Sequence, residues 1–231
     1  MTIEMIAFDA DDTLWENEVY YQKALEDLIK ILSPWESPEV VNEIVNEIEH
    51  RNMNHYGYGI KAFILSLIEA ALQISNHEIQ GEAIAEILAI GRSMLEADIH
   101  MKPKVRETLT ALKEKYPLMV ITKGDLLDQS AKIKRSGLDG FFTIIEIVND
   151  KDEETYLSIL EDHHINPHHF LMVGNSIRSD ILPILNIGGI AVYIPSETTW
   201  SHEIVPDFNA DNHGFYELTH MGELLELIKE M

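Results

Sequence analysis

Ile3-Glu4-Met5-Ile6-Ala7-Phe8-Asp9-Ala10-Asp11-Asp12-Thr13-Leu14 is the stretch of sequence that decides the fold. The apolar run up to Phe8 predicts a buried strand, because it is short and ends in a polar turn. Asp9 and Asp11 follow directly, and side chains separated by one residue leave the same side of an extended backbone. Buried carboxylates are costly unless they are compensated, so we expect this end of the strand to open onto solvent or a metal ion.

Taken alone, Asp-x-Asp also fits a solvated acidic turn, which is a common feature. The longer pattern, Asp-x-Asp-x-Thr-Leu directly after an N-terminal hydrophobic strand, is more specific. It resembles the first signature of the haloacid dehalogenase-like (HAD) hydrolase superfamily, most of whose members are phosphatases. The resemblance then depends on whether the later signatures follow in order.

The composition limits the partners. Forty acidic residues against 17 basic ones give a formal net charge of −23. Nucleic acids and anionic membranes each require a basic face, so we expect neither as a partner. No apolar segment approaches the roughly 20 residues of a membrane span, and the N-terminus lacks the pattern of a signal sequence. We therefore expect a cytoplasmic protein, and the sequence leaves monomer and homodimer open.

After the first strand, the hydrophobic spacing is helical for some eighty residues. The predicted helices are 16–32, one opened by Ser37-Pro38, 60–74 and 78–94, with a loop rich in glycine and aromatics over 52–59. Strands and helices then alternate. We expect strands at 118–121, 141–148, 170–173 and 189–194, and an edge strand near Phe208. We expect helices at 104–115, 126–136, 153–163, 178–186 and from Thr219 to Lys229.

Repeated strand–helix units of this length predict an α/β fold with a Rossmann-like, doubly wound parallel sheet. At 231 residues the chain suits one such domain with an insertion. We expect residues 1–14 and 100–231 to form the α/β core and residues 15–99 to form a helical, four-helix cap subdomain. An insertion after the first strand's loop is placed to cover it like a lid.

Three later positions match the remaining signatures of the superfamily. Thr122, followed by Lys123, ends the strand 118–121, where a hydroxyl and backbone N–H groups can bind phosphate; an ordinary strand-to-helix turn is the alternative. Lys151 lies between a strand and a Glu-rich helix start and resembles the third signature; a surface charge is its alternative, and Lys134 and Arg135 are less suitable candidates.

The fourth match is Leu171-Met172-Val173-Gly174-Asn175-Ser176-Ile177-Arg178-Ser179-Asp180, a strand ending in glycine and then a polar loop. The family commonly has an acid where Asn175 stands. An amide oxygen can still bind Mg²⁺ but brings no charge, so Asp180 becomes the favoured metal ligand. The departure bears on metal affinity and activity rather than on the fold.

The resemblance implies a Mg²⁺-dependent phosphatase acting on a small phosphate monoester. It implies Asp9 as the nucleophile, Asp11 as the general acid and base, and Lys151 and Thr122, with Lys123, as phosphate-binding groups. Mg²⁺ would be held by Asp9, the Asp11 carbonyl, Asp180 and Asn175. Dehalogenases of the family lack the second acid, so Asp11 favours a phosphatase.

Substrate selection is expected in the inserted helices. The candidates are at the entrance and around the glycine-containing loop: Asn17, Glu18, Tyr21, Asn54, His55, Tyr56, Tyr58 and Lys61. Tyrosines that simply pack the helices are the alternative. The histidine pairs 163–164 and 168–169 lack a companion carboxylate pattern and are expected to be solvated. A phosphomutase and a non-catalytic phosphate-binding relative remain as alternative functions, and the identity of the phosphate ester is not legible.

Overall fold

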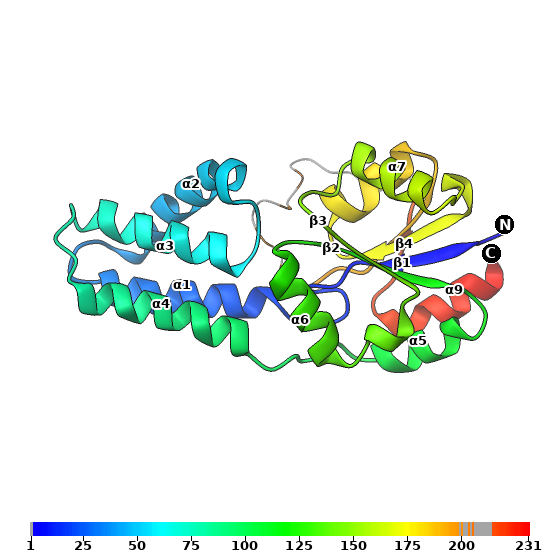
Figure 1. Cartoon of the computed structure of the whole chain (residues 1–231), viewed down its shortest axis with the longest axis horizontal. Coiled ribbons are helices and arrows are strands. Elements are labelled where there is room, and N and C mark those ends of the chain that lie inside the picture. The colour runs from blue at the N-terminus through cyan, green and yellow to red at the C-terminus, as the bar shows by residue number, and fades with distance from the viewer. Residues whose placement is uncertain (1, 199, 201–202, 204, 206–213) are drawn as a thin grey trace. The chain divides into compact units, whose positions relative to one another are not determined.

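The structure is a computed structural model that describes residues 2–198, 200, 203, 205 and 214–231. Figure 1 shows its two kinds of architecture, a twisted sheet flanked by helices and a group of helices alone. The chain forms two compact units, one made of Met1–Glu16 with Ile99–Met231 and the other of Asn17–Asp98. We call them the α/β unit and the helical unit.

The α/β unit contains a six-stranded parallel sheet, which confirms the predicted fold class. Its strands lie in the order β3-β2-β1-β4-β5-β6. Their bounds are β1 Met5–Phe8, β2 Leu118–Lys123, β3 Ile144–Val148, β4 Phe170–Gly174, β5 Ile190–Tyr193 and β6 Tyr216–Glu217. In this order β1 lies between β2 and β4, with Phe8 opposite Val120 and Val173. The carboxyl ends of these three strands therefore meet, as they do at ligand sites of open α/β sheets.

Alternate residues of β1 enter different hydrophobic cores. Ile6 and Phe8 pack on one face of the sheet and Met5 and Ala7 on the other. The first face is covered by α5 (Val105–Lys113) and α9 (Leu224–Glu230), and the second by α7 (Glu153–Asp162) and α8 (Leu182–Asn186). Because both faces are covered, the central strands β1 and β4 contain no polar side chain, as expected for a doubly wound sheet. The helix α6 (Leu126–Ser136) follows β2.

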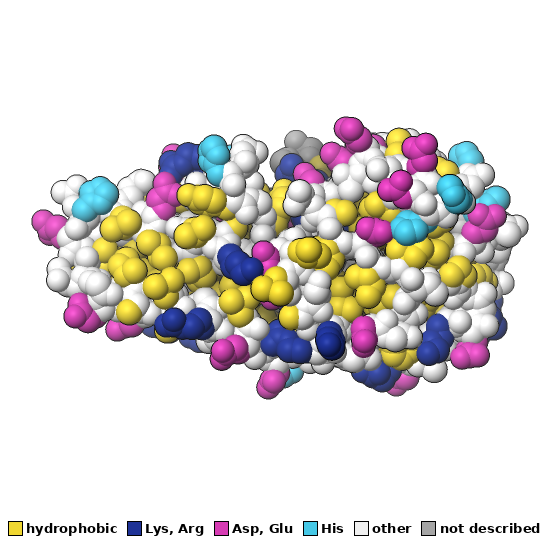
Figure 2. Space-filling model, viewed as in Figure 1, with side chains coloured by type: hydrophobic (Ala, Val, Ile, Leu, Met, Phe, Trp, Pro, Cys, Tyr) yellow, Lys and Arg dark blue, Asp and Glu magenta, His cyan; other side chains and the backbone are white. Residues whose placement is uncertain are grey.

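The helical unit consists of α1 (Glu18–Leu32), α2 (Pro38–Tyr56), α3 (Ile60–Ile74) and α4 (Gly81–Glu96). Its own hydrophobic core includes Leu28, Leu67 and Ile87, all fully buried. Apolar side chains also reach the surface, as Figure 2 shows over this unit, and Leu65 and Leu88 are nearly half exposed. None of the described helices in either unit is long and apolar enough to cross a membrane.

Several predicted boundaries were wrong, each for a local reason. The loop expected over 52–59 is only 57–59, because α2 continues to Tyr56 and ends where Gly57 takes a positive φ of 69°. The helix expected from Glu78 begins at Gly81, after a turn with positive φ at Asn76 and His77.

Three further segments of the α/β unit differ from expectation. The strand predicted over 141–148 begins only at Ile144, because a 3₁₀ turn occupies Asp139–Phe141. The helix predicted over 178–186 is a wide π turn, Ile177–Ile181, followed by α8. The expected edge strand near Phe208 falls outside the described residues, and the described edge strand at that end of the sheet is β6.

Candidate active site

Asp9, Lys151 and Asp180 form a buried charged cluster at the carboxyl end of β1. The Lys151 ammonium donates to Asp9 Oδ1 at 2.6 Å and to Asp180 Oδ1 at 2.8 Å. The three residues are only 7 %, 3 % and 1 % exposed. Charges this deeply buried are costly unless they compensate one another, and here one cation serves two anions. With both carboxylates ionised, the cluster carries a net charge of one negative unit.

Burial and the neighbouring charges shift the pKa values in this cluster. Burial, with a smaller contribution from the Asp180 carboxylate, raises the pKa of Asp9 to about 7, even though Lys151 opposes the rise. Burial disfavours the charged form of Lys151, but the carboxylates of Asp180 and Asp9 outweigh it and hold the lysine pKa well above its ordinary value. Lys151 is thus a permanent cation beside a carboxylate whose pKa is close to neutrality, and perturbed pKa values of this kind cluster at functional sites.

The π turn and a glycine place Asp180 against the end of β4. The backbone N–H of Ser176 donates to Asp180 Oδ2 at 3.0 Å. A Cβ atom at Gly174 would lie 2.2 Å from that same oxygen, so only glycine leaves room for the carboxylate. π turns of this kind are frequent at functional sites. The local sequence therefore fixes the carboxylate close to Asp9.

Asn175 and Thr13 complete the surroundings of Asp9. The Thr13 hydroxyl donates to Asp9 Oδ2 at 2.9 Å. The Asn175 amide fits its neighbours when its nitrogen donates to Thr13 Oγ1 at 2.9 Å and to the Asp11 carbonyl oxygen and Asp9 Oδ2, each at 3.2 Å. Turned over, the same amide presents its oxygen to the place where those oxygens meet.

These residues fit a divalent cation. The donors are the carboxylates of Asp9 and Asp180, the Asp11 carbonyl and the Asn175 amide, all of the oxygen type that Mg²⁺ prefers. Two carboxylates match the charge of one divalent ion. Among the residues that the structure describes, no group of three His, Asp or Glu side chains could hold a metal ion, so an ion bound here would also need the carbonyl and amide oxygens.

Asp11 lies in a different set of contacts from Asp9, because β1 ends at Phe8 and the backbone turns beyond it. Asp11 Oδ1 accepts from Trp15 Nε1 at 2.8 Å, and Oδ2 accepts from Gln129 Nε2 at 2.8 Å. The Lys132 ammonium donates to both oxygens, at 2.8 and 2.6 Å. The side chain of Asp11 remains 21 % exposed, so it is open on one side.

Thr122 and Lys123, both predicted to bind phosphate, lie at the end of β2 and differ in their hydrogen-bond and ion-pair partners. Among the described residues, Thr122 Oγ1 is a buried hydroxyl with no hydrogen-bond partner. The Lys123 ammonium donates to Ser179 Oγ at 3.0 Å and is paired with Glu203. Although burial opposes it, Lys123 together with the hydroxyls of Ser176 and Ser179 lowers the pKa of Glu203 to about 2. The Lys123 charge is therefore already shared with a carboxylate.

The residues predicted to select the substrate belong to the helical unit. His55 and Tyr56 are exposed at the end of α2, with their rings 6.5 Å apart, while Tyr58 is half-buried and Lys61 is exposed. In the α/β unit, Lys134 and Arg135 are exposed on α6 and stand outside the cluster. The histidine pairs lie at the surface, where His163 contacts Glu146, His168 contacts the Gly188 carbonyl and His169 contacts Glu4.

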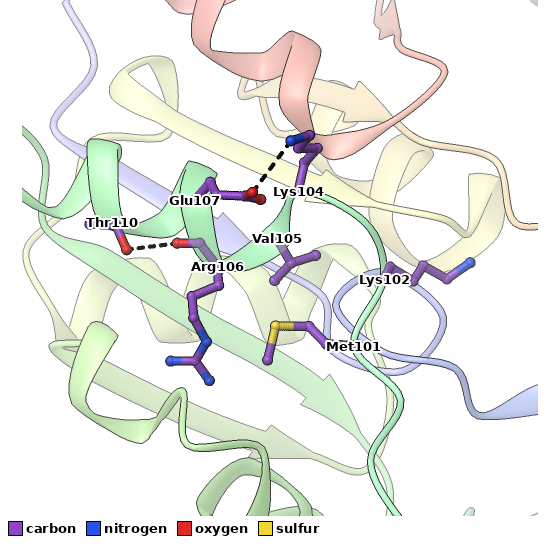
Figure 3. Close-up of a pocket in the computed structure, with 7 residues that line it drawn as sticks. All are labelled: Met101, Lys102, Lys104, Val105, Arg106, Glu107 and Thr110. Carbon is purple, nitrogen blue, oxygen red and sulfur yellow. Dashed lines mark hydrogen bonds and ion pairs between the residues drawn. The ribbon is translucent and has the colours of Figure 1, made fainter.

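An open depression of about 600 Å³ lies at the start of α5, and its lining does not include Asp9, Asp11 or Asp180. Figure 3 shows its cationic side chains, Lys102, Lys104 and Arg106, pointing apart rather than toward a common centre. Lys102 donates to Ser196 Oγ, Lys104 pairs with Glu107, and Arg106 donates to the Ser136 carbonyl. This depression therefore lacks the convergent polar groups of a binding site.

Comparison with known proteins identifies the family. Residues 3–188 match the family model described as haloacid dehalogenase-like hydrolase. The chain belongs to the haloacid dehalogenase-like hydrolases. This HAD-like chain is also 34 % identical to a haloacid dehalogenase-like family hydrolase from Xanthomonas campestris, whose crystal structure matches with a TM-score of 0.88 over 99 % of this chain and 91 % of the other.

Two curated relatives of the HAD-like chain carry specific names. It is 26 % identical to the glyceraldehyde 3-phosphate phosphatase of Pyrococcus furiosus, over 98 % of this chain and 93 % of the relative. It is 23 % identical to the N-acylneuraminate-9-phosphatase of Rattus norvegicus, over 80 % of this chain and 79 % of the relative. The chain is a hydrolase, as the sequence predicted.

Sequence reasoning missed Gln129, Lys132 and Glu203. A signal for the first two was present, because Gln129, Lys132, Ile133 and Ser136 share one face of α6 at helical spacing and are all buried. A lysine and a glutamine on an otherwise core-facing stripe indicate a buried polar partner. No signal of this kind marks Glu203, which reaches the site from a segment far along the chain.

Proposed function

We propose that this hydrolase is a phosphatase that cleaves a small phosphate monoester through a phosphoaspartate on Asp9. The observation that carries the proposal is the buried contact of Lys151 with both Asp9 and Asp180 at the carboxyl end of β1. Phosphatase relatives that align along most of the chain support the same reaction class.

In the proposed first step, a carboxylate oxygen of Asp9 attacks phosphorus, and the bond from phosphorus to the ester oxygen breaks. Lys151, already beside Asp9, would offset the negative charge on the phosphoryl oxygens. The Thr122 hydroxyl is free to donate to one of those oxygens, because no described group accepts from it. Lys123 is a weaker candidate, since a phosphate would compete with Glu203 for its charge.

Asp11 is proposed to handle the protons. Its carboxyl group would give a proton to the departing ester oxygen, and its carboxylate would then take one from the water that hydrolyses the phosphoaspartate. An alcohol needs this proton, whereas a halide does not, so the second acid supports phosphate ester hydrolysis over dehalogenation. The helical unit is proposed to act as the substrate-selecting cap.

Mg²⁺ is the proposed metal ion, held by Asp9, the Asp11 carbonyl, Asn175 and Asp180. When bound, it would supply charge shielding between the anionic nucleophile and the anionic phosphate. The pKa of Asp9, raised to about 7 by burial, supports this assignment, because a bound cation would favour the ionised form that a nucleophilic carboxylate needs.

The proposal is tested by measuring inorganic phosphate released from 4-nitrophenyl phosphate and from a panel of small monoesters. We expect turnover that requires Mg²⁺, is lost in EDTA and falls by at least ~10³-fold in Asp9→Asn, because removal of a covalent nucleophile disables the step it starts. Asp162→Asn, which removes an equal charge at the exposed end of α7, should retain full activity. Turnover that survives Asp9→Asn would overturn the mechanism.

Asn175→Asp tests whether the side chain at position 175 binds the metal ion. The substitution adds a third carboxylate to the donor set, and ligand charge tunes cation affinity. We expect half-maximal activity at a Mg²⁺ concentration lower by about tenfold. An unchanged Mg²⁺ requirement would show that the side chain at position 175 does not bind the ion.

A further inference from the structure

Asp11 is held by an unusually complete set of donors. A carboxylate has about four lone-pair sites. Here Trp15 and Lys132 occupy those of Oδ1, and Gln129 and Lys132 occupy those of Oδ2. A side chain with this many bonds has one orientation, although it is still partly exposed on its open side. The contacts define where the Asp11 carboxyl group points.

Two of these donors, Gln129 and Lys132, lie one turn apart on α6, and that helix is itself fixed to the end of β2. The Asp125 side chain caps α6 by accepting from the backbone N–H of Asp128 at 3.0 Å. Gln129 Nε2 also donates to the Lys123 carbonyl at 2.9 Å. A Cβ at Gly124 would lie only 3.0 Å from that amide nitrogen, so the glycine leaves room for the bridge.

Stability alone does not account for these side chains. Lys132 is 5 % exposed and Gln129 is 2 % exposed. Burying an ammonium group costs several kcal/mol, and apolar residues of similar volume in such places are often equally or more stable. Lys132 also lies 3.8 Å from the buried Asp128 carboxylate. However, its shorter contacts, and one from Gln129, go to Asp11 at the end of the sheet where Asp9 lies.

We infer that Gln129 and Lys132 are positioning residues that aim the Asp11 carboxyl group at the leaving oxygen. The inference rests on the proposed function. In the first step the ester oxygen takes the electron pair of the broken bond to phosphorus and the proton of Asp11. In the second step, a water oxygen bonds to phosphorus, the bond from phosphorus to Asp9 breaks, and the water proton returns to Asp11.

Lys132 suits this cycle because it donates to both oxygens of Asp11. It can give up one of its bonds to Asp11 and keep the other, which frees one lone pair of Asp11 to carry the proton. Gln129 and Trp15, which each donate to one oxygen of Asp11, hold the carboxyl group in place while this bond is open. Errors of about 1 Å in such a group can cost ~10²-fold in rate.

The test is a leaving-group series, phenyl, 4-nitrophenyl and 2,4-dinitrophenyl phosphate, with kcat/KM measured for each. This ratio reports steps up to departure of the leaving group, where the acid acts. General acids contribute 10²–10⁴-fold, so we expect Lys132→Met to lower kcat/KM by ~10–100-fold for phenyl phosphate. The loss for 2,4-dinitrophenyl phosphate should be less than ~3-fold, because a good leaving group needs little proton transfer. Gln129→Leu should show the same trend with a smaller loss.

Lys134→Met is the matched control, because it removes the same charge from an exposed position on the same helix. It should leave all three substrates unchanged. An equal loss on all three substrates in Lys132→Met would show that Lys132 supports the fold of the site and does not position the acid. If wild type itself fails to release phosphate while remaining folded, the proposed function has failed and not merely this inference.

The chain has no cysteine, which permits a chemical rescue. Lys132→Cys, alkylated with 2-bromoethylamine while unfolded and then refolded, regains an ammonium group at one position only. We expect this treatment to restore most of the phenyl phosphate activity, whereas iodoacetamide, which adds a neutral group, should not. Equal recovery with both reagents, or with neither in a protein of native circular dichroism, would overturn the inference. Wild type taken through the same steps corrects for refolding.

Discussion

The end of β1 and residues 54–61, around the loop 57–59, were both expected to be functional, but their side chains lie in different environments. In the α/β unit, Asp9 and Lys151 are buried and each has a charged partner within 3 Å. In the helical unit, His55, Tyr56 and Lys61 are exposed side chains on the surface of a packed group of helices. The charged residues of the first region follow short apolar strands, and this combination is easy to recognise in the sequence. The exposed residues of the second region form no specific motif, so the sequence gives little indication of whether they bind a substrate.

The largest effect is expected from Lys151→Met. It leaves Asp9 and Asp180 as two buried carboxylates without their shared cation, and breaking a buried pair costs about 3–5 kcal/mol. We expect phosphate release to fall by at least ~10²-fold, since the charge facing the phosphate is lost. The thermal midpoint should fall as well. Activity and melting temperature within error of wild type would remove the contrast between the two regions.

A smaller and different effect is expected from Lys61→Met in the helical unit. Because the side chain is exposed, the melting temperature should not change. If this loop selects the substrate, kcat/KM should change by up to about tenfold for some monoesters in a panel, with KM rising and kcat preserved. Turnover of 4-nitrophenyl phosphate serves as the internal reference. A uniform fall in kcat across the panel would instead place Lys61 in the chemistry.

The smallest expected effect is a change in melting temperature at Glu49, a carboxyl group whose pKa is raised to about the same value as that of Asp9. Asp9 has charged partners, whereas in the helical unit burial alone raises the pKa of Glu49 to about 7. Between pH 4.5 and 7 the unfolded chain loses the Glu49 proton while the folded chain keeps it, so stability falls as the pH rises. Above pH 7 the loss is complete.

Glu49→Gln should therefore melt at a higher temperature than wild type at pH 8 and at the same temperature at pH 4. The gain is expected to be a few degrees, at about 2–4 °C per kcal/mol for a chain of this size. Glu47→Gln, an exposed position on the same helix, is the control and should match wild type at both pH values. A gain that does not depend on pH would show that ionisation of Glu49 is not its cause.

The sequence predicted the strands well and their connections less well. Short apolar runs such as 118–121 and 170–173 are long enough to identify a buried strand, and both became strands in a parallel sheet. The π turn at 177–181 has no such pattern in its hydrophobic spacing, and it places Asp180 against Gly174. The end of α2 at Gly57 depends on local backbone geometry.

The candidate site divides similarly. Asp9 and Thr122 lie at the ends of β1 and β2, so the predicted strands already indicate their positions. Lys151 and Asp180 lie in the segments after β3 and β4 and were predicted from their resemblance to the family signatures. Lys132 reaches Asp11 across 121 residues of sequence, and its neighbours on α6 contain no motif. Attention to the buried face of α6, rather than to the exposed Lys134 and Arg135, would have found it.

The fit of Asp180 against Gly174 makes the two positions mutually dependent. With 2.2 Å between a Cβ at position 174 and the carboxylate oxygen, even alanine would displace the side chain it faces. A larger residue at 174 could be accommodated only if position 180 shrank at the same time, and that would delete the carboxylate. A substitution of Gly174 alone therefore cannot keep the Asp180 carboxylate where it is, and a loop transplanted from another protein would have to bring both residues with it.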